Sequence, residues 1–212
     1  MDMVIDLEQL VEKFNLKIKG VIHVGAHVGQ EYEVYQKLNI GIKKVVWFEP
    51  VKNTYMELIK NLPDGSITYN VALGNEEGER EMYIETVNKG QSNSLLKPGT
   101  HLKSYPRIAF TGIEIVTMKR LDDYKLSKPF NMLNMDVQGF ELEVLKGGTN
   151  TLKNIDIIYT EINTEDVYIN CVHITELDEC LAKKGFTRVF TKMAHTSWGD
   201  ALYLRTKNHE RN

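Results

Sequence analysis

The first half of the chain alternates between short apolar runs and amphipathic segments. Apolar residues spaced three and four apart predict a helix with one buried face over residues 3–14. Short runs rich in β-branched and aromatic side chains predict buried strands at residues 21–24, 43–48 and 66–73. Helices are expected between these strands, one ending at Leu38 and one over residues 54–62. This β-α-β-α-β order is typical of a parallel sheet with crossover helices.

The second half returns to the same alternation after a long polar interruption. Residues 86–111 are polar and irregular, and a loop of this length inside a compact domain is typical of a functional or disordered segment. Further strands are expected at residues 79–85, 113–118, 131–137 and 155–162, and helices at residues 140–146 and 173–183. Residues 186–192 and 201–205 predict a closing pair of antiparallel strands.

Composition narrows the classes of protein to consider. Of the 212 residues, 42% are hydrophobic and 26% are charged, which favours one folded domain over residues 1–212. We expect residues 1–19 to contribute an N-terminal helix and residues 86–111 a loop, and these two segments to contact the substrate. The net charge of −3 argues against a general binder of nucleic acid, which usually carries a basic excess.

The cysteines and the apolar runs bear on the compartment. Cys171 and Cys180 lie nine residues apart and form no CxxC pair, so we expect two reduced thiols. No apolar run approaches the roughly 20 residues that span a membrane, and acids stand at positions 2 and 6 where a secretory signal carries bases. These features predict a cytoplasmic protein without a membrane span.

Gly25 and Gly29 frame the turn after the first predicted strand. The G-x-G-x-x-G spacing of a dinucleotide turn is absent, but Gly25 permits a tight turn that a ligand can approach closely. Gly29 would let the next helix start close to the strand. An ordinary strand-to-helix turn explains the same two residues equally well.

Glu49 gives this turn a functional interpretation. It ends the second predicted strand, where an acid in doubly wound sheets accepts hydrogen bonds from both ribose hydroxyls. Pro50 fits the start of a helix, so Glu49 also fits a helix cap. Beyond the third strand, the small segment at Val71 and Ala72 leaves room for a flat ring such as adenine, although a plain strand end has the same residues.

The order and spacing of these segments resemble the motifs of FkbM-type methyltransferases, which are class I enzymes that use S-adenosylmethionine. The matching segments are spread over about residues 20–205, at residues 23–30, 47–50, 71–74, 92–95, 118–124, 134–141, 144–147 and 160–163. The resemblance implies an α/β, Rossmann-like fold with a mostly parallel seven-stranded sheet, helices on both faces and an antiparallel last strand.

The resemblance also implies which residues bind S-adenosylmethionine. They are His23, Gly25, Ala26, Gly29, Glu49, Pro50, Val71, Ala72, Ser94 and Asp136. Two positions depart from the family pattern. His23 stands where the family more often has an acid that supports the methionine end, so the charge there would depend on pH. Asn134 stands where the family often has a lysine.

Asp136 and Glu161 are the first two candidates for the chemistry. They end the fourth and fifth strands of the expected fold, and the site of an open α/β sheet lies at such carboxyl ends. Asp136 is expected to act as a base or to anchor the amino group of the cofactor, and Glu161 is the second candidate. Each also fits a solvated or helix-capping carboxylate. His195, between the last two strands, is a third candidate base, or a solvated loop residue.

A metal site is not expected, because Asp136, Glu161 and Asn163 form no dense carboxylate motif. The predicted function is an S-adenosylmethionine-dependent O-methyltransferase that acts on a hydroxyl of a sugar or glycan, by in-line transfer with help from a base. Methyl transfer to nitrogen in nucleic acid or protein is one alternative, although the fourth-strand block lacks the proline box of the nucleic-acid enzymes. A nucleotide-binding module without catalysis is another.

Overall fold

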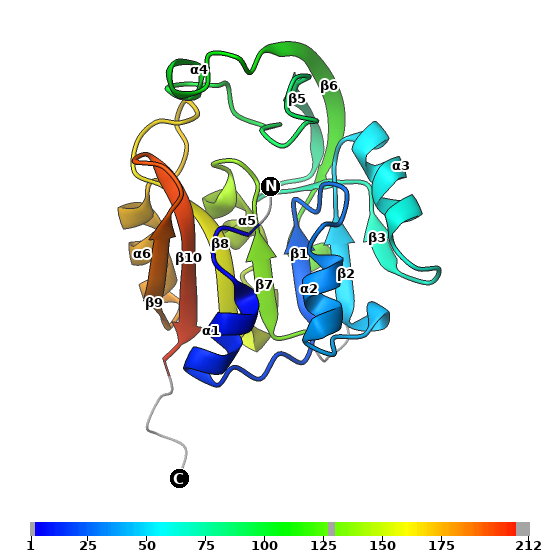
Figure 1. Ribbon diagram of the computed structural model, residues 1–212, viewed down its shortest axis with the longest axis vertical. Coiled ribbons are helices and arrows are strands. Elements are labelled where there is room, and N and C mark those ends of the chain that lie inside the picture. Colours follow the sequence, from blue (N-terminus) through cyan, green and yellow to red (C-terminus); the bar gives the residue numbers. More distant parts are fainter. Residues whose placement is uncertain (1–2, 127–129, 207–212) are drawn as a thin grey trace.

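A computed structural model describes residues 3–126 and 130–206. Its main sheet has seven strands in the order β3-β2-β1-β7-β8-β10-β9 (Figure 1). The five strands β3, β2, β1, β7 and β8 pair with their neighbours in parallel. Strand β10 is antiparallel to both β8 and β9. The strands are β1 (Val21–Val24), β2 (Val45–Phe48), β3 (Ile67–Tyr69), β7 (Met132–Met135), β8 (Ile157–Asn163), β9 (Phe186–Met193) and β10 (Trp198–Arg205). The predicted fold, with its antiparallel last strand, is confirmed.

Helices cover both faces of this sheet. The α-helices are α1 (Leu7–Phe14), α2 (Tyr32–Lys37), α3 (Lys52–Asn61), α4 (His101–Ser104), α5 (Glu141–Gly147) and α6 (Ile174–Lys183). Three short 3-10 turns are η1 (Ile42–Lys44), η2 (Leu121–Asp123) and η3 (Thr151–Asn154). Helices α1, α2 and α3 contribute to one apolar core and α5 and α6 to the other, because alternate residues of the buried strands face opposite sides.

The N-terminal helix is shorter than its apolar spacing predicts. The Asp6 carboxylate accepts hydrogen bonds from the backbone N–H groups of Glu8 and Gln9, which fixes the start of α1 at Leu7 rather than at residue 3. The preceding residues run instead toward the carboxyl ends of the strands, where the Val4 N–H donates to Asp200 at 2.8 Å. Residues 3–5, and not α1 itself, therefore reach the candidate site.

A second, three-stranded sheet was not predicted. It has the order β4-β6-β5, formed by β4 (Ala72–Leu73), β5 (Gly78–Glu85) and β6 (Phe110–Lys119). The single strand expected over residues 66–73 is therefore wrong, because it divides into β3 and β4. The Asn70 side chain donates to the carbonyls of Glu49 and Pro50, which holds the chain at the crossing from one sheet to the other.

The segment between β5 and β6 lies over the carboxyl ends of the main sheet (Figure 1). It contains the short helix α4 and is attached to the loop after β8. The N–H groups of Gly99 and His101 donate to the Val167 carbonyl at 2.9 and 3.1 Å, and the Ile169 N–H donates to Lys97. Residues 86–111 are thus a wall built against the sheet. Of the helices described, none has both the length and the apolar character needed to cross a membrane.

Candidate active site

The turn after β1 brings three elements together. The Gly25 and Ala26 N–H groups both donate to the Phe48 carbonyl at 3.0 Å, which ties the turn to β2. Gly25 has φ +80°, and a Cβ there would lie 1.8 Å from the Asp136 carbonyl oxygen. Only glycine permits both this conformation and this close approach of β1 to the end of β7. Gly29 instead faces Leu58 and Leu62 of α3.

Glu49 lies at the end of β2, with its carboxylate fixed by two backbone donors. Its Oε2 accepts from the His27 N–H and its Oε1 from the Val51 N–H, both at 2.9 Å. The residue is 6% exposed, and burial raises its pKa to about 8 against the effect of these two donors. Each oxygen keeps a lone pair that points to no described protein donor, so Glu49 retains capacity for a ligand.

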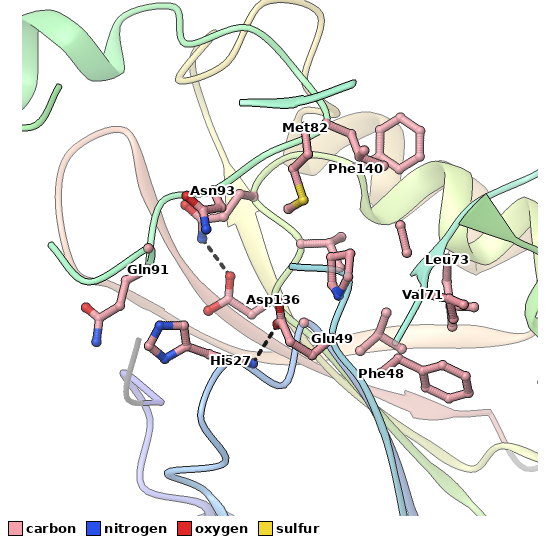
Figure 2. A pocket seen from close by; sticks show the side chains of 18 residues that line it. His27, Phe48, Glu49, Val71, Leu73, Met82, Gln91, Asn93, Asp136 and Phe140 are labelled. Atoms are coloured by element: carbon pink, nitrogen blue, oxygen red, sulfur yellow. Dashed lines mark hydrogen bonds between the residues drawn. The ribbon is translucent and has the colours of Figure 1, made fainter. Parts of the chain in front are cut away.

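A first cavity opens beside Glu49 (Figure 2). Its walls include Phe48 and Pro50 from the end of β2, Val71 and Ala72 around β4, and Phe140 before α5. Gly25 and Asp136 also line it. Six of the residues predicted to bind the cofactor thus line one cavity: Gly25, Glu49, Pro50, Val71, Ala72 and Asp136.

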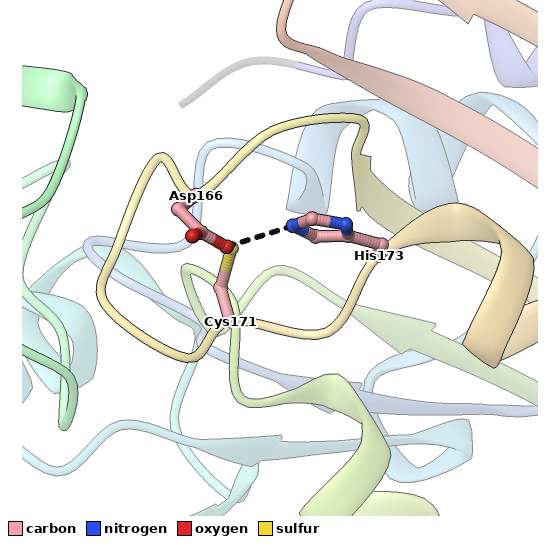
Figure 3. A group of neighbouring side chains, drawn as sticks. All are labelled: Asp166, Cys171 and His173. Carbon is pink, nitrogen blue, oxygen red and sulfur yellow. Dashed lines mark hydrogen bonds and ion pairs between the residues drawn. The ribbon is translucent and has the colours of Figure 1, made fainter.

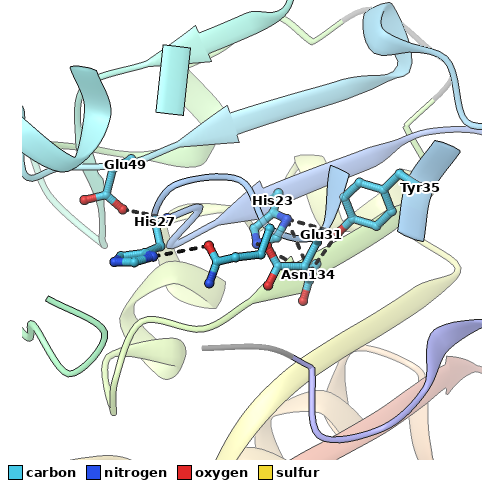
Figure 4. Close-up of polar contacts among 7 residues, drawn as sticks. His23, His27, Glu31, Tyr35, Glu49 and Asn134 are labelled. Carbon is cyan, nitrogen blue, oxygen red and sulfur yellow. Dashed lines mark hydrogen bonds and ion pairs between the residues drawn. The ribbon is translucent and has the colours of Figure 1, made fainter. Parts of the chain in front are cut away.

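The remaining predicted cofactor residues do not line this first cavity. Ala26 is buried in the core on the α1 side of the sheet. The Ser94 hydroxyl donates to the Gln138 carbonyl at 2.8 Å, so Ser94 touches the site through the backbone of Gln138. His23 is buried and stacks on Trp47, with the ring centroids 4.9 Å apart. Its Nδ1 lies 3.0 Å from the Tyr35 hydroxyl (Figure 4). Burial lowers the pKa of His23 to about 3, so its imidazole is neutral at neutral pH.

Gln138 joins the two predicted catalytic carboxylates. Its Nε2 donates to Asp136 at 2.6 Å and also to Glu161, and its Oε1 accepts from the Tyr168 hydroxyl at 2.7 Å. Its backbone has φ +55°, which is unusual for a residue with a side chain. The helix predicted over residues 140–146 is present as α5, which starts at Glu141, so Gln138 lies in the turn before it. The left-handed turn points the amide between the carboxylates.

Glu161 is 4% exposed, and burial is the main reason that its pKa lies well above the usual value. The negative charge of Asp136 and a hydrogen bond with it act in the same direction. The raised pKa of Glu161 favours its protonated form. Two carboxyl groups that share a site in this way titrate as one unit.

Two further cavities meet at this pair. The second cavity, of about 350 Å³, is lined by Gln138 and Glu161 on one side and by His101, Tyr105 and Trp198 on the other. The third is polar and is lined by His23, Glu31, Asp136, Glu161 and Asp200, with Met3 and Val4 at its edge. Asp136 borders the first and third cavities, Gln138 the first and second, and Glu161 the second and third.

His195 does not join the other two predicted catalytic residues. It is exposed in the loop between β9 and β10, and its Nδ1 lies 2.9 Å from the Ser197 hydroxyl. Its ring is 5.8 Å from that of Tyr105, so it approaches the outer rim of the second cavity without lining it.

A group of possible metal ligands lies on the loop between β8 and α6 (Figure 3). Ligand atoms of Asp166, Cys171 and His173 all lie within 4.8 Å of one another, a grouping that the sequence did not suggest. However, the His173 ring accepts the Glu176 N–H as the N-cap of α6, and its Nε2 lies 2.9 Å from Asp166. Both ring nitrogens are thereby engaged, with the proton on Nε2, which leaves no lone pair there for a metal ion.

The buried carboxyl groups predict an unusual dependence of stability on pH. Burial raises the pKa of Glu49 to about 8, of Glu141 to about 7 and of Asp200 to about 6. When the pKa of a carboxyl group is higher in the folded than in the unfolded state, the folded state binds more protons at any pH between these two pKa values. Stability therefore falls as pH rises toward the folded-state pKa. The lowered pKa values of His23 and His101 make stability rise with pH, but only below about pH 6.5.

We therefore expect the melting temperature of the ligand-free protein to fall by roughly 5 °C between pH 6.5 and 8.5, at about 2–4 °C per kcal/mol for a chain of this size. Scanning calorimetry at constant ionic strength measures the melting temperature at each pH. Glu49→Gln is expected to make the slope shallower, because it removes one of the titrating groups. A melting temperature that stays constant or rises over this range would contradict the prediction.

Comparisons with known proteins agree with this arrangement. Residues 23–188 match the model of the methyltransferase FkbM domain. The 2-O-methyltransferase NoeI of Sinorhizobium fredii is 36% identical over 119 residues, which cover 55% of this chain and 48% of NoeI. The chain thus aligns with about half the length of that relative.

Solved structures share the fold at low sequence identity. A methyltransferase FkbM from Methylobacillus flagellatus aligns with a TM-score of 0.53 and 13% identity, over 88% of this chain and 43% of that one. The magnesium protoporphyrin IX methyltransferase of Synechocystis, solved with bound SAH, aligns with a TM-score of 0.52 and 12% identity, over 94% and 80%.

Proposed function

The chain belongs to the methyltransferase FkbM family, whose members depend on S-adenosylmethionine, and on this premise we propose that it methylates a hydroxyl group of a sugar or glycan. The observation that carries the proposal is the meeting of three cavities at Asp136, Gln138 and Glu161. One cavity suits an adenosine, one a charged amino-acid end and one an acceptor. Group transfer requires two ligands to meet in this way.

The residues present fit S-adenosylmethionine. The first cavity combines apolar walls for a flat ring, at Phe48, Val71 and Phe140, with the Glu49 carboxylate for a diol. The third cavity gathers the acidic side chains Glu31, Asp136 and Asp200, whose negative character suits a ligand with a sulfonium and an ammonium group. We propose that Glu49 holds the ribose and that Asp136 holds the cationic end.

When bound, the cofactor supplies an electrophilic methyl group on a sulfonium. The protein has to bring the acceptor oxygen into line with that methyl group and to exclude water, and alignment of this kind supplies several kcal/mol. Gln138 contributes by fixing both carboxylates with its amide. Residues 86–111 contribute by forming one wall of the second cavity, over the carboxyl ends of the strands.

The second cavity suits a small, neutral, hydroxyl-bearing ring. Tyr105 and Trp198 provide aromatic surface, and the Trp198 indole N–H donates to the Tyr105 hydroxyl at 2.7 Å, which fixes both rings. The volume of about 350 Å³ accommodates a saccharide unit but not a folded protein. The similarity to NoeI, a 2-O-methyltransferase, supports oxygen as the acceptor atom.

Two wider proposals follow from the same arrangement. We propose that residues 1–212 act as a single methyltransferase domain, because both apolar cores run across the same sheet. We also propose that the protein works in the cytoplasm. Cys171 and Cys180 are free thiols, as is usual in a reducing compartment.

We expect S-adenosylmethionine to bind the wild-type protein and Glu49→Gln to raise its dissociation constant about 10- to 100-fold. The variant loses a carboxyl oxygen as an acceptor for the ribose and turns an NH₂ group toward one of the two backbone donors, and leaving such a donor unpaired costs about 1–3 kcal/mol. Isothermal titration calorimetry measures both proteins. Glu57→Gln, an exposed acid on α3, is the matched control and should bind like the wild type.

A transfer assay with tritiated methyl groups then decides the acceptor. We expect label on methyl glycosides of common hexoses and deoxyhexoses, and none on RNA or on a protein mixture. Label on nitrogen of RNA or protein would favour the alternative acceptors. A wild-type protein that fails to bind S-adenosylmethionine would refute the proposed function as a whole.

A further inference from the structure

His101 is a buried titratable residue that no motif accounts for. It opens the short helix α4, is 4% exposed and lines the second cavity. Its Nε2 lies 3.2 Å from the Ser92 hydroxyl, while its Nδ1 is buried and has no hydrogen-bond partner among the described residues. A buried polar atom without a partner is costly, and a ligand in the adjoining cavity can supply that partner.

The ring of His101 is held from several sides. Tyr105, Phe110 and Tyr168 surround it, with ring centroids 5.1, 5.3 and 5.6 Å away. The Tyr168 hydroxyl in turn donates to the Oε1 atom of Gln138. His101 is therefore fixed relative to the place where the cofactor and acceptor cavities meet, as a reacting group must be.

The two carboxyl groups at that place are poorly suited to take a proton from the acceptor. The Gln138 amide donates to both Glu161 and Asp136 and so occupies acceptor capacity on each, and the raised pKa of Glu161 favours its protonated form. Asp136 lines the first and third cavities but not the second. Of the titratable side chains that line the second cavity, His101, Tyr105 and Glu161, only an imidazole is an effective base near neutral pH.

We propose that His101 is the general base of the reaction, and that its Nδ1 receives the proton of the acceptor hydroxyl. The inference rests on the proposed function, because it assigns a role in that same site. As the acceptor oxygen forms its bond to the methyl carbon, the carbon–sulfur bond breaks and its electron pair stays on sulfur. The hydroxyl proton passes to His101, so one positive charge leaves the sulfonium and one appears on the imidazolium.

The surroundings of His101 suit both of its charge states. Burial lowers its pKa, which keeps the imidazole neutral and able to accept a proton before the reaction. The Glu85 carboxylate on β5 acts in the opposite direction and stabilises the imidazolium once it forms. Ser92, Tyr105 and Tyr168 are the polar residues that contact the ring, and none of them carries a positive charge. The other polar side chains in the cavity wall, Asn88, Gln138, Glu161 and Trp198, carry none either.

The kinetic test compares His101→Gln with Lys103→Gln, an exposed residue of the same short helix. With the best glycoside acceptor, His101→Gln is expected to lower kcat about 10²- to 10⁴-fold. The dissociation constant of S-adenosylmethionine should stay within twofold, and Lys103→Gln should behave like the wild type.

The fall of the wild-type rate toward acidic pH, as the imidazole takes a proton, should disappear in His101→Gln. Free imidazole should restore part of the activity of His101→Ala, since that variant opens space for it.

A second readout needs no acceptor. In ¹⁵N NMR spectra of the wild-type protein at pH 7.5, His101 should carry its proton on Nε2 and none on Nδ1. A proton on Nδ1, or a His101→Gln enzyme with the wild-type kcat, would overturn the inference while leaving the proposed function intact. Failure of the wild-type protein to bind S-adenosylmethionine would instead refute the proposed function.

Discussion

Replacing Gly25 by alanine is expected to abolish detectable cofactor binding and to lower the free energy of unfolding by roughly 4 kcal/mol. The new Cβ would lie 1.8 Å from the Asp136 carbonyl oxygen, which is backbone and has no free rotation by which to move aside. The φ of +80° adds a penalty for any residue with a side chain. Strand β1 and the end of β7 would have to separate, and with them the walls that Gly25 and Asp136 give to the first cavity.

Gly41→Ala is the matched control for this substitution. Nothing lies within 4 Å of a Cβ at Gly41, and its backbone, with φ −68°, is accessible to alanine. It is expected to change stability by no more than about 0.5 kcal/mol and to bind S-adenosylmethionine normally. Chemical denaturation and calorimetric titration of the two variants make the comparison. Wild-type affinity in Gly25→Ala would show that the close contact between β1 and β7 does not shape the site.

Part of the site could be predicted from the sequence because it depends on local patterns and on the order of the strands. Gly25 and Glu49 were found because a parallel sheet places the end of each strand at one edge, so their chemistry follows from strand order alone. Strand β1 also has the bounds that its β-branched run predicts, because it is buried on both faces. Such features are local, so the types of residue and their spacing are enough to predict them.

The features that were missed depend on contacts between distant segments. Asn70 ends β3 by bonding to the carbonyls of Glu49 and Pro50, so the apolar run over residues 66–73 divides between two sheets. Gln138 follows a strand and precedes a glycine, which suggests a helix start. Its role between Asp136 and Glu161 is visible only once β7 and β8 are adjacent.

His101 illustrates the same limit in the segment of residues 86–111. Its polar, irregular composition gave no sign that the segment packs against the loop after β8. Because that packing buries His101 beside Tyr168, a residue 67 positions later becomes its neighbour. A weak signal did exist in the sequence: two aromatic residues, at positions 105 and 110, follow His101 within an otherwise polar loop.

Replacing Asp136 by asparagine is expected to lower kcat/KM for S-adenosylmethionine about 10²- to 10³-fold. The substitution keeps the shape of the side chain but removes the negative charge that we propose holds the cationic end of the cofactor. It also disturbs the carboxyl pair. Without the charge of Asp136, the pKa of Glu161 is expected to fall, because that charge is one cause of its elevation.

Most of this loss should appear in binding, which distinguishes an anchor from a base. Asp136 lines the first and third cavities and not the second, so an anchor of the cofactor fits its position better than a base for the acceptor. Calorimetric titration should therefore show a dissociation constant raised at least about 10-fold. Glu12→Gln, an exposed acid on α1, is the control and should change neither constant. If Asp136→Asn kept the wild-type affinity and lost only kcat, Asp136 would be the base, and His101 would have to yield that role to it.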